Sequence, residues 1–204
     1  MHCKLIGIVD YGLGNISAFE NILNSFNKKF RIIKKTADFK KISKIILPGV
    51  GSFDKANELL EKNNFIDTLN EKVIINKTPI LGVCVGMQIM AETSEEGQSK
   101  GFSWINANVK LLKTNNKLPV PHMGWNEIVL NEEIDIFKNI DDLKFYFLHS
   151  YYFSNSINLK NTALTNYGVK FISAFNHENI YGIQFHPEKS HKSGIQLLEN
   201  FCNL

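Results

Sequence analysis

The chain has 204 residues, of which 44% are hydrophobic and 21% charged, and a net charge of +3. This composition is typical of a globular protein with one substantial core. Because Arg31 is the only arginine among 23 basic residues, the planar guanidinium groups that most base-reading sites use are nearly absent. We therefore expect no nucleic-acid partner.

The sequence also argues against a membrane protein and a metal centre. No apolar run approaches the roughly 20 residues of a membrane span, and the N-terminal residues lack the features of a signal peptide. We expect a cytoplasmic protein without membrane contact. Cys3, Cys84 and Cys202 are odd in number and widely spaced, which predicts neither a disulfide framework nor a zinc cluster.

The first half of the chain alternates between short apolar runs and amphipathic segments. The apolar runs predict strands at residues 5–10, 30–33, 45–47 and 79–83. The amphipathic segments predict helices that carry Ile16, Phe19, Ile22, Leu23 and Phe26; Ala56, Leu59 and Leu60 after an N-cap at Ser52; residues 65–75; and Met87, Ile89, Met90 and Ala91. This alternation indicates a parallel sheet covered on both faces.

The second half has strand-like runs without long helices between them. We predict strands at residues 109–112, 127–130, 145–153, 171–176 and 180–185, with a hairpin turn at 176–179. A closing helix at 193–204 should point Ile195, Leu198 and Phe201 inward. The whole chain is therefore expected to form one α/β domain, residues 1–204, with a mixed, mostly parallel central sheet flanked by helices.

The most informative local motif surrounds Cys84, where a predicted buried strand meets a helix. The sequence Gly-Val-Cys-Val-Gly resembles a nucleophile elbow, in which small neighbours permit a tight turn that exposes the central side chain. The N-terminus of the following helix would place backbone N–H groups and a positive dipole end near the sulfur, which could favour a thiolate and hold an oxyanion. The same pattern also fits a structural cysteine in a well-packed turn, so a second feature must decide.

A cysteine nucleophile needs a base, and the base needs an acceptor that orients it. His186-Pro187-Glu188 supplies both at the end of a predicted strand, although alone it also fits a surface loop. His122 and His149 remain alternative candidates for the base. A glycine loop at residues 47–52 offers N–H groups to an oxyanion. Neither this loop nor the one at 11–15 has the spacing of a phosphate-binding or dinucleotide-binding motif.

In this order, the glycine loop, the cysteine elbow and the His-Pro-Glu sequence resemble those of class I (triad) glutamine amidotransferases. Further blocks narrow the resemblance to the glutaminase subunits of imidazole glycerol phosphate synthase, the HisH family. These blocks are residues 10–15, 121–126, 146–152 and 184–190.

The resemblance implies a glutaminase. Cys84 would attack the side-chain amide of L-glutamine to form a thioester, His186 would move the proton, and Glu188 would orient His186. The backbone N–H groups of Val50 and Val85 would form the oxyanion hole. Residues implied to hold glutamine are Gly49, Gly51, Gln88, Glu96, Ser150 and Tyr151. No cofactor or metal is implied.

The resemblance also implies a partner, because the family's ammonia passes to a HisF-like (β/α)₈ cyclase subunit in a heterodimer. Residues 10–15, 121–126 and Lys189 are similar to the surface that faces it, although Met123 and Trp125 could equally belong to the core. The implied pathway is histidine biosynthesis. The family's usual Gly-Leu-Gly-x-x-Pro-Gly segment is replaced by residues 101–108, which leaves open a paralogue that supplies ammonia to another amidation, such as that of a surface sugar.

Two further function classes share some of these features. A catalytically silent scaffold could keep the fold, but it should have lost Cys84, His186 or Glu188, and all three are present. A cysteine hydrolase acting alone would need no barrel partner. A silent scaffold would not hydrolyse glutamine, and a lone hydrolase would be active without a barrel partner.

Overall fold

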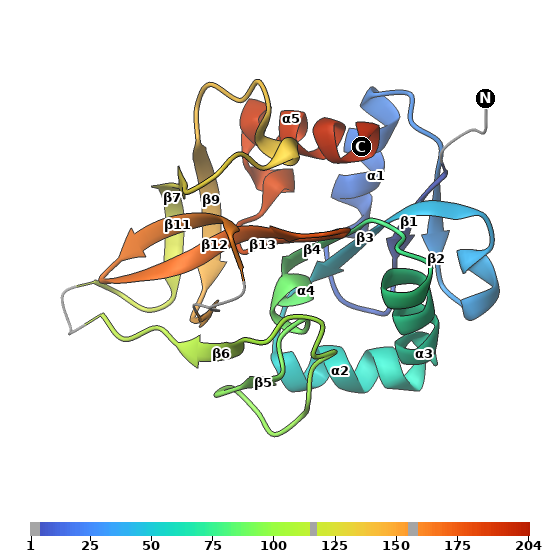
Figure 1. The fold of residues 1–204 in the computed structure, drawn as a ribbon, viewed down its shortest axis with the longest axis horizontal. Coiled ribbons are helices and arrows are strands. Elements are labelled where there is room, and N and C mark those ends of the chain that lie inside the picture. Colours follow the sequence, from blue (N-terminus) through green and yellow to red (C-terminus); the bar gives the residue numbers. More distant parts are fainter. Residues whose placement is uncertain (1–4, 115–117, 155–158) are drawn as a thin grey trace.

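A parallel sheet of five strands forms the centre of the protein. The computed structural model describes residues 5–114, 118–154 and 159–204 (Figure 1). The five parallel strands, in spatial order, are β2 (Phe30–Ile33), β1 (Leu5–Val9), β3 (Ile42–Gly49), β4 (Ile80–Cys84) and β13 (Ile180–Ile183). Their carboxyl ends share one edge, which is where ligands bind in open α/β sheets.

Antiparallel strands extend the sheet beyond β13. They follow in the order β12 (Val169–His177), β10 (Tyr151–Phe153), β6 (Asn108–Leu111) and β5 (Thr93–Ser94), the last running parallel to β6. β11 (Asn161–Tyr167) pairs with β12 and with β8 (Val129–Leu130). A second, two-stranded sheet joins β7 (His122–Glu127) and β9 (Lys144–His149).

Helices cover both faces of the parallel strands. α1 (Ile16–Ser25) and α5 (His191–Asn203) lie on one face, while α2 (Phe53–Lys62) and α3 (Phe65–Asn70) lie on the other (Figure 1). A π-helical turn, Glu71–Ile75, continues α3. Short 3₁₀ turns lie at Thr36–Phe39, Asp135–Phe137 and Pro187–Lys189. The predicted α/β architecture is therefore confirmed.

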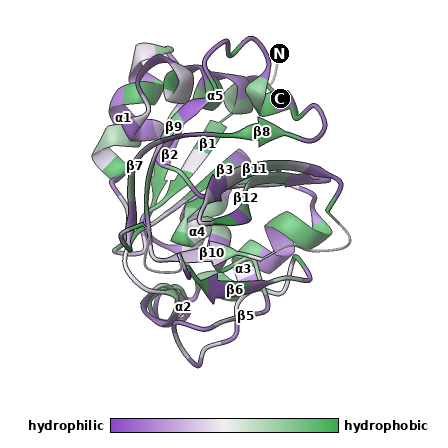
Figure 2. Ribbon diagram, turned by 90° about the vertical axis from the view of Figure 1, so that its left-hand side faces the viewer, coloured by the Kyte–Doolittle hydropathy of each residue, from purple (hydrophilic) through white to green (hydrophobic). Residues whose placement is uncertain are grey.

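The helices are amphipathic, as the sequence pattern predicts. Hydrophobic and hydrophilic residues alternate along α1 in Figure 2, and its buried residues, Phe19 and Leu23, are four positions apart. This spacing places them on one face of the helix. Among the described residues, no helix is long and apolar enough to cross a lipid bilayer.

The helix predicted to follow Cys84 and extend to residue 91 is much shorter than expected. α4 (Val85–Gln88) is a single turn. The carbonyl groups of Ile89 and Met90 accept hydrogen bonds from Phe102 (2.7 Å) and Ile105 (3.1 Å), respectively. These carbonyls therefore bind a returning loop instead of continuing the helix, and the prediction for residues 89–91 was wrong.

Three other predictions also need correction. The run at 145–153 is two strands, β9 and β10, which belong to different sheets. The run at 127–130 is likewise divided between β7 and β8. Leu198 and Phe201 of α5 are buried as predicted, but Ile195 is 39% exposed. The buried face of α5 consists of Gly194, Leu197, Leu198, Phe201 and Cys202, and Ile195 lies outside it.

Candidate active site

Cys84 lies in a strained turn between β4 and α4. Its backbone has φ +55° and ψ −112°, a combination that residues with a side chain rarely adopt. A Cβ added to Gly86 would lie 2.0 Å from the Leu47 carbonyl oxygen, and one added to Gly82 would lie 2.5 Å from the Gly86 oxygen. The two glycines are therefore needed for close backbone approach, as expected for a nucleophile elbow.

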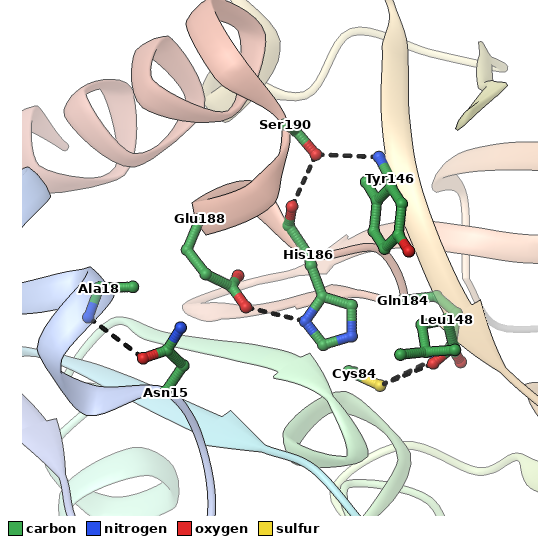
Figure 3. Close-up of polar contacts among 9 residues, drawn as sticks. All are labelled: Asn15, Ala18, Cys84, Tyr146, Leu148, Gln184, His186, Glu188 and Ser190. Carbon is green, nitrogen blue, oxygen red and sulfur yellow. Dashed lines mark hydrogen bonds and ion pairs between the residues drawn. The ribbon is translucent and has the colours of Figure 1, made fainter. Parts of the chain in front are cut away.

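The structure brings Cys84, His186 and Glu188 together at the carboxyl edge of neighbouring strands. β4 ends at Cys84, and the chain continues from its parallel neighbour β13 to His186. The Nδ1 atom of His186 lies 2.9 Å from Oε1 of Glu188, and His186 lines the same cavity as Cys84, which attracts the imidazole electrostatically. Figure 3 shows the imidazole between the carboxylate and the sulfur.

The backbone around His186 is fixed by its neighbours. Its N–H donates to the Tyr146 carbonyl (2.8 Å). The Ser190 hydroxyl donates to the His186 carbonyl (2.6 Å) and accepts from the Tyr146 N–H (2.9 Å) (Figure 3). These bonds connect the turn after β13 with β9 and hold the imidazole in place.

The surroundings of His186 favour its protonated form. Burial by itself lowers the pKa of the imidazole, but hydrogen bonds and electrostatic attraction from Cys84 and Glu188 outweigh burial and raise this pKa to about 10. The imidazole is therefore a cation at neutral pH, held between the sulfur and the carboxylate. This arrangement can attack a carbonyl carbon and deliver a proton to a leaving group.

A cavity of about 380 Å³ opens beside the sulfur. It is lined by most of the predicted site residues, namely Val50, Gly51, Cys84, Val85, Gln88, Glu96, Ser150, Tyr151, His186 and Glu188. Gly49 is not among the lining residues. A Cβ added to Gly49 would lie 2.4 Å from the Gly86 nitrogen, so this glycine permits close packing against the elbow.

Two polar side chains of the cavity have fixed partners. Glu96 accepts a hydrogen bond from the Phe53 N–H (2.7 Å) at the start of α2, and burial raises the pKa of its carboxyl group. The Gln88 amide nitrogen donates to the Tyr151 carbonyl (2.9 Å) and to Oε1 of Gln184 (3.0 Å). The cavity thus presents a carboxylate and an amide to a small polar ligand.

Backbone N–H groups are available near the sulfur for an oxyanion. Val85 is the first residue of α4, so its N–H has no acceptor within the helix. Val50 follows the end of β3, where Gly49 pairs with Cys84. Val85 thus directly follows Cys84 in the chain, and Val50 directly follows the residue that pairs with Cys84.

Sequence analysis missed two groups that contact Cys84. The Gln184 amide nitrogen lies 3.7 Å from the sulfur, and the sulfur lies 3.9 Å from the Leu148 carbonyl oxygen. Gln184 precedes His186 by two residues, and strand alternation places such residues on one side. This spacing could have identified Gln184, whereas no sequence signal pointed to Leu148.

The two alternative bases have a different environment. His122 and His149 hydrogen-bond to each other, and burial lowers their pKa values to about 4 and about 3, respectively. His149 lines the cavity but its ring nitrogens contact His122 and the Tyr151 carbonyl. His186, with its carboxylate partner, is the better candidate. Cys202 is a buried free thiol, and Cys3 lies outside the described residues.

Comparisons with known proteins identify the family of the chain. The profile of the family described as "Glutamine amidotransferase class-I" matches residues 7–204. The chain is 46% identical over 204 residues to the imidazole glycerol phosphate synthase subunit HisH of Leptospira borgpetersenii, covering 98% of this chain and 100% of the relative. The HisH subunit of Leptospira interrogans is 45% identical with the same coverage. A solved structure described as a glutamine amidotransferase is similar in fold, with a TM-score of 0.76, 14% identity and 97% of both chains covered.

Proposed function

Because the chain belongs to the class I glutamine amidotransferase family, we propose that it hydrolyses L-glutamine to glutamate and ammonia. Residues 1–204 would act as one glutaminase domain. The observation that carries this proposal is the position of His186, which hydrogen-bonds to Glu188 and lines the same small cavity as Cys84.

The reaction uses the sulfur and the imidazole in turn. The Cys84 thiolate attacks the side-chain amide carbon, while the N–H groups of Val50 and Val85 stabilise the oxyanion. The C–N bond then breaks, His186 gives its proton to the leaving nitrogen, and ammonia departs from a glutamyl thioester. Water, deprotonated by His186, attacks the thioester carbon and the C–S bond breaks, which releases glutamate and regenerates the Cys84 thiolate. Glu188 keeps the imidazole oriented throughout.

Binding of glutamine requires partners for both ends of a zwitterion. The Glu96 carboxylate would pair with the α-ammonium group, because a buried charge needs an opposite charge or hydrogen bonds. Gln88 and the backbone at Ser150 and Tyr151 would bind the remaining polar groups, and the loop at Gly49 and Gly51 would close over the amide.

We also propose a heterodimer with a HisF-like (β/α)₈ cyclase subunit. The relatives are named as subunits of imidazole glycerol phosphate synthase, and these names favour histidine biosynthesis over a paralogous sugar amidation. Ammonia released into water would be protonated and lost as a nucleophile, so a closed route is needed. Met123 and Trp125 on β7 are 64% and 49% exposed. They do not belong to the core, and their exposure suits a partner surface with residues 10–15 and Lys189.

The test is glutamate formation by the complex of this chain with its candidate cyclase. Cys84→Ala should abolish it, because no thioester can form, while Cys202→Ala should retain it as the matched buried-cysteine control. Imidazole glycerol phosphate should form from glutamine and the phosphorylated precursor. Wild-type hydrolysis rates in Cys84→Ala would refute the proposal, and a complex that aminates only a sugar would support the paralogue.

A further inference from the structure

A continuous chain of hydrogen bonds leads from the cavity to two buried histidines. The Tyr151 carbonyl accepts from Gln88 Nε2 (2.9 Å) and from His149 Nδ1 (2.8 Å). His149 Nε2 then lies 3.0 Å from His122 Nδ1, and His122 Nε2 lies 3.2 Å from the Asn126 amide nitrogen. The side chains of both histidines are therefore linked to the wall of the glutamine cavity.

The partners at the two ends determine where each proton lies. A carbonyl oxygen can only accept, so His149 carries its hydrogen on Nδ1, and its Nε2 must accept from the Nδ1–H of His122. His122 Nε2 in turn accepts from the amide of Asn126, whose Oδ1 accepts from the Glu127 N–H (2.8 Å). Every bond has one donor and one acceptor only when both imidazoles are neutral.

The burial of the two rings preserves this neutral state. His122 and His149 are 2% and 6% exposed. Burial lowers both pKa values, and for His149 the electrostatic effects of His122 and His186 lower it further. His122 is also stacked between Phe147 and Tyr167, with ring centroids at 4.7 and 3.9 Å. The hydrogen-bond network through the two histidines is therefore buried and tightly packed.

The hydrogen-bond network determines which atom of the Gln88 side chain is available to a ligand. Both hydrogens of its amide nitrogen are used, one by the Tyr151 carbonyl and one by Gln184. The amide oxygen is then the polar atom left for the cavity, so Gln88 can accept from a ligand N–H but cannot donate. If the Gln88 amide were free to rotate, it could present either its oxygen or its NH₂ group to the cavity. The site would then no longer favour a ligand group that donates a hydrogen bond.

We propose that His149, held by His122, is a positioning residue for glutamine binding. It fixes the Tyr151 carbonyl, which orients the Gln88 amide toward the substrate. Neither histidine touches the reacting atoms, and their action is on binding more than on the chemical step. This inference rests on the proposed glutaminase function.

The test measures KM and kcat for glutamine in the complex with the cyclase. His149→Leu removes the bond to Tyr151 and should raise KM about fivefold or more, while kcat changes by less than about twofold. His149→Asn places an amide N–H near the position of Nδ1 and should restore most of the affinity. In a Gln88→Leu background, His149→Leu should add no further increase in KM.

Controls separate positioning from general destabilisation. Ser173→Ala removes one buried hydrogen bond, from its hydroxyl to the Ala163 carbonyl, and should leave KM unchanged. If His149→Leu does not fold, His122→Phe keeps the ring stacking and should raise KM by a smaller factor. The inference would be overturned by a wild-type KM in His149→Leu, or by an increase in KM in His149→Asn equal to that in His149→Leu. In either case, turnover by the wild-type complex would still support the glutaminase function. No turnover by the wild-type complex would instead refute the glutaminase itself.

Discussion

The imidazole of His186 donates from Nδ1 to Glu188 across 2.9 Å, and the two side chains are almost completely excluded from water. Replacing the carboxylate with an amide keeps the shape but removes the negative charge that orients and stabilises the imidazolium. We expect Glu188→Gln to lower kcat for glutamine hydrolysis about 100-fold or more. The matched control is Glu178→Gln, at an exposed position, which should have wild-type kcat. Wild-type turnover in Glu188→Gln would show that the carboxylate has no role.

The raised pKa of His186 predicts an alkaline limit to activity. With a pKa of about 10, the imidazole is protonated below this pH and neutral above it. Because the leaving nitrogen takes this proton, kcat/KM should fall above pH 10, roughly tenfold per pH unit. Glu188→Gln removes one cause of the raised pKa and should move the limit to lower pH. Brief assays after a pH jump from neutral pH measure this, and an unchanged limit in the variant would contradict it.

Glu96 is the only carboxylate besides Glu188 among the residues that line the described cavity. Its proposed partner is the α-ammonium group of glutamine, so Glu96→Gln should raise KM about tenfold or more with a smaller change in kcat. Glu95→Gln is the neighbouring control, because Glu95 contacts the Leu111 N–H (2.9 Å) and does not line the cavity. Equal KM values in the two variants would exclude ion pairing at Glu96.

Gly86 should be intolerant of any side chain. The added methyl group of Gly86→Ala would lie 2.0 Å from a backbone oxygen, that of Leu47, which cannot move without displacing β3. We expect the free energy of unfolding to fall by about 1–3 kcal/mol and the glutaminase activity to be lost. Gly7→Ala meets only side-chain atoms, at 3.1 Å and beyond, and should cost less. Urea unfolding compares the two, and equal stabilities would contradict the tight-turn explanation.

Local sequence patterns predict the alternation of strands and helices and point to the residues of the proposed triad. Hydrophobic periodicity and glycine spacing depend on neighbours within a few positions, so they can be read without a structure. The strand leading to Cys84, the hairpin at residues 176–179 and the turn after β13 all followed from such local patterns.

The length of α4 and the division of residues 145–153 between two sheets depend on the tertiary fold. So do the hydrogen-bond partners of Gln88 and those of Cys84. The carbonyls of Ile89 and Met90 bind a loop that follows later in the chain, and no local pattern specifies that partner. Similarly, His149 reaches the cavity because β9 pairs with β7 and the chain then enters a different sheet. Hydrogen bonds between residues that are remote in sequence depend on how the whole fold packs.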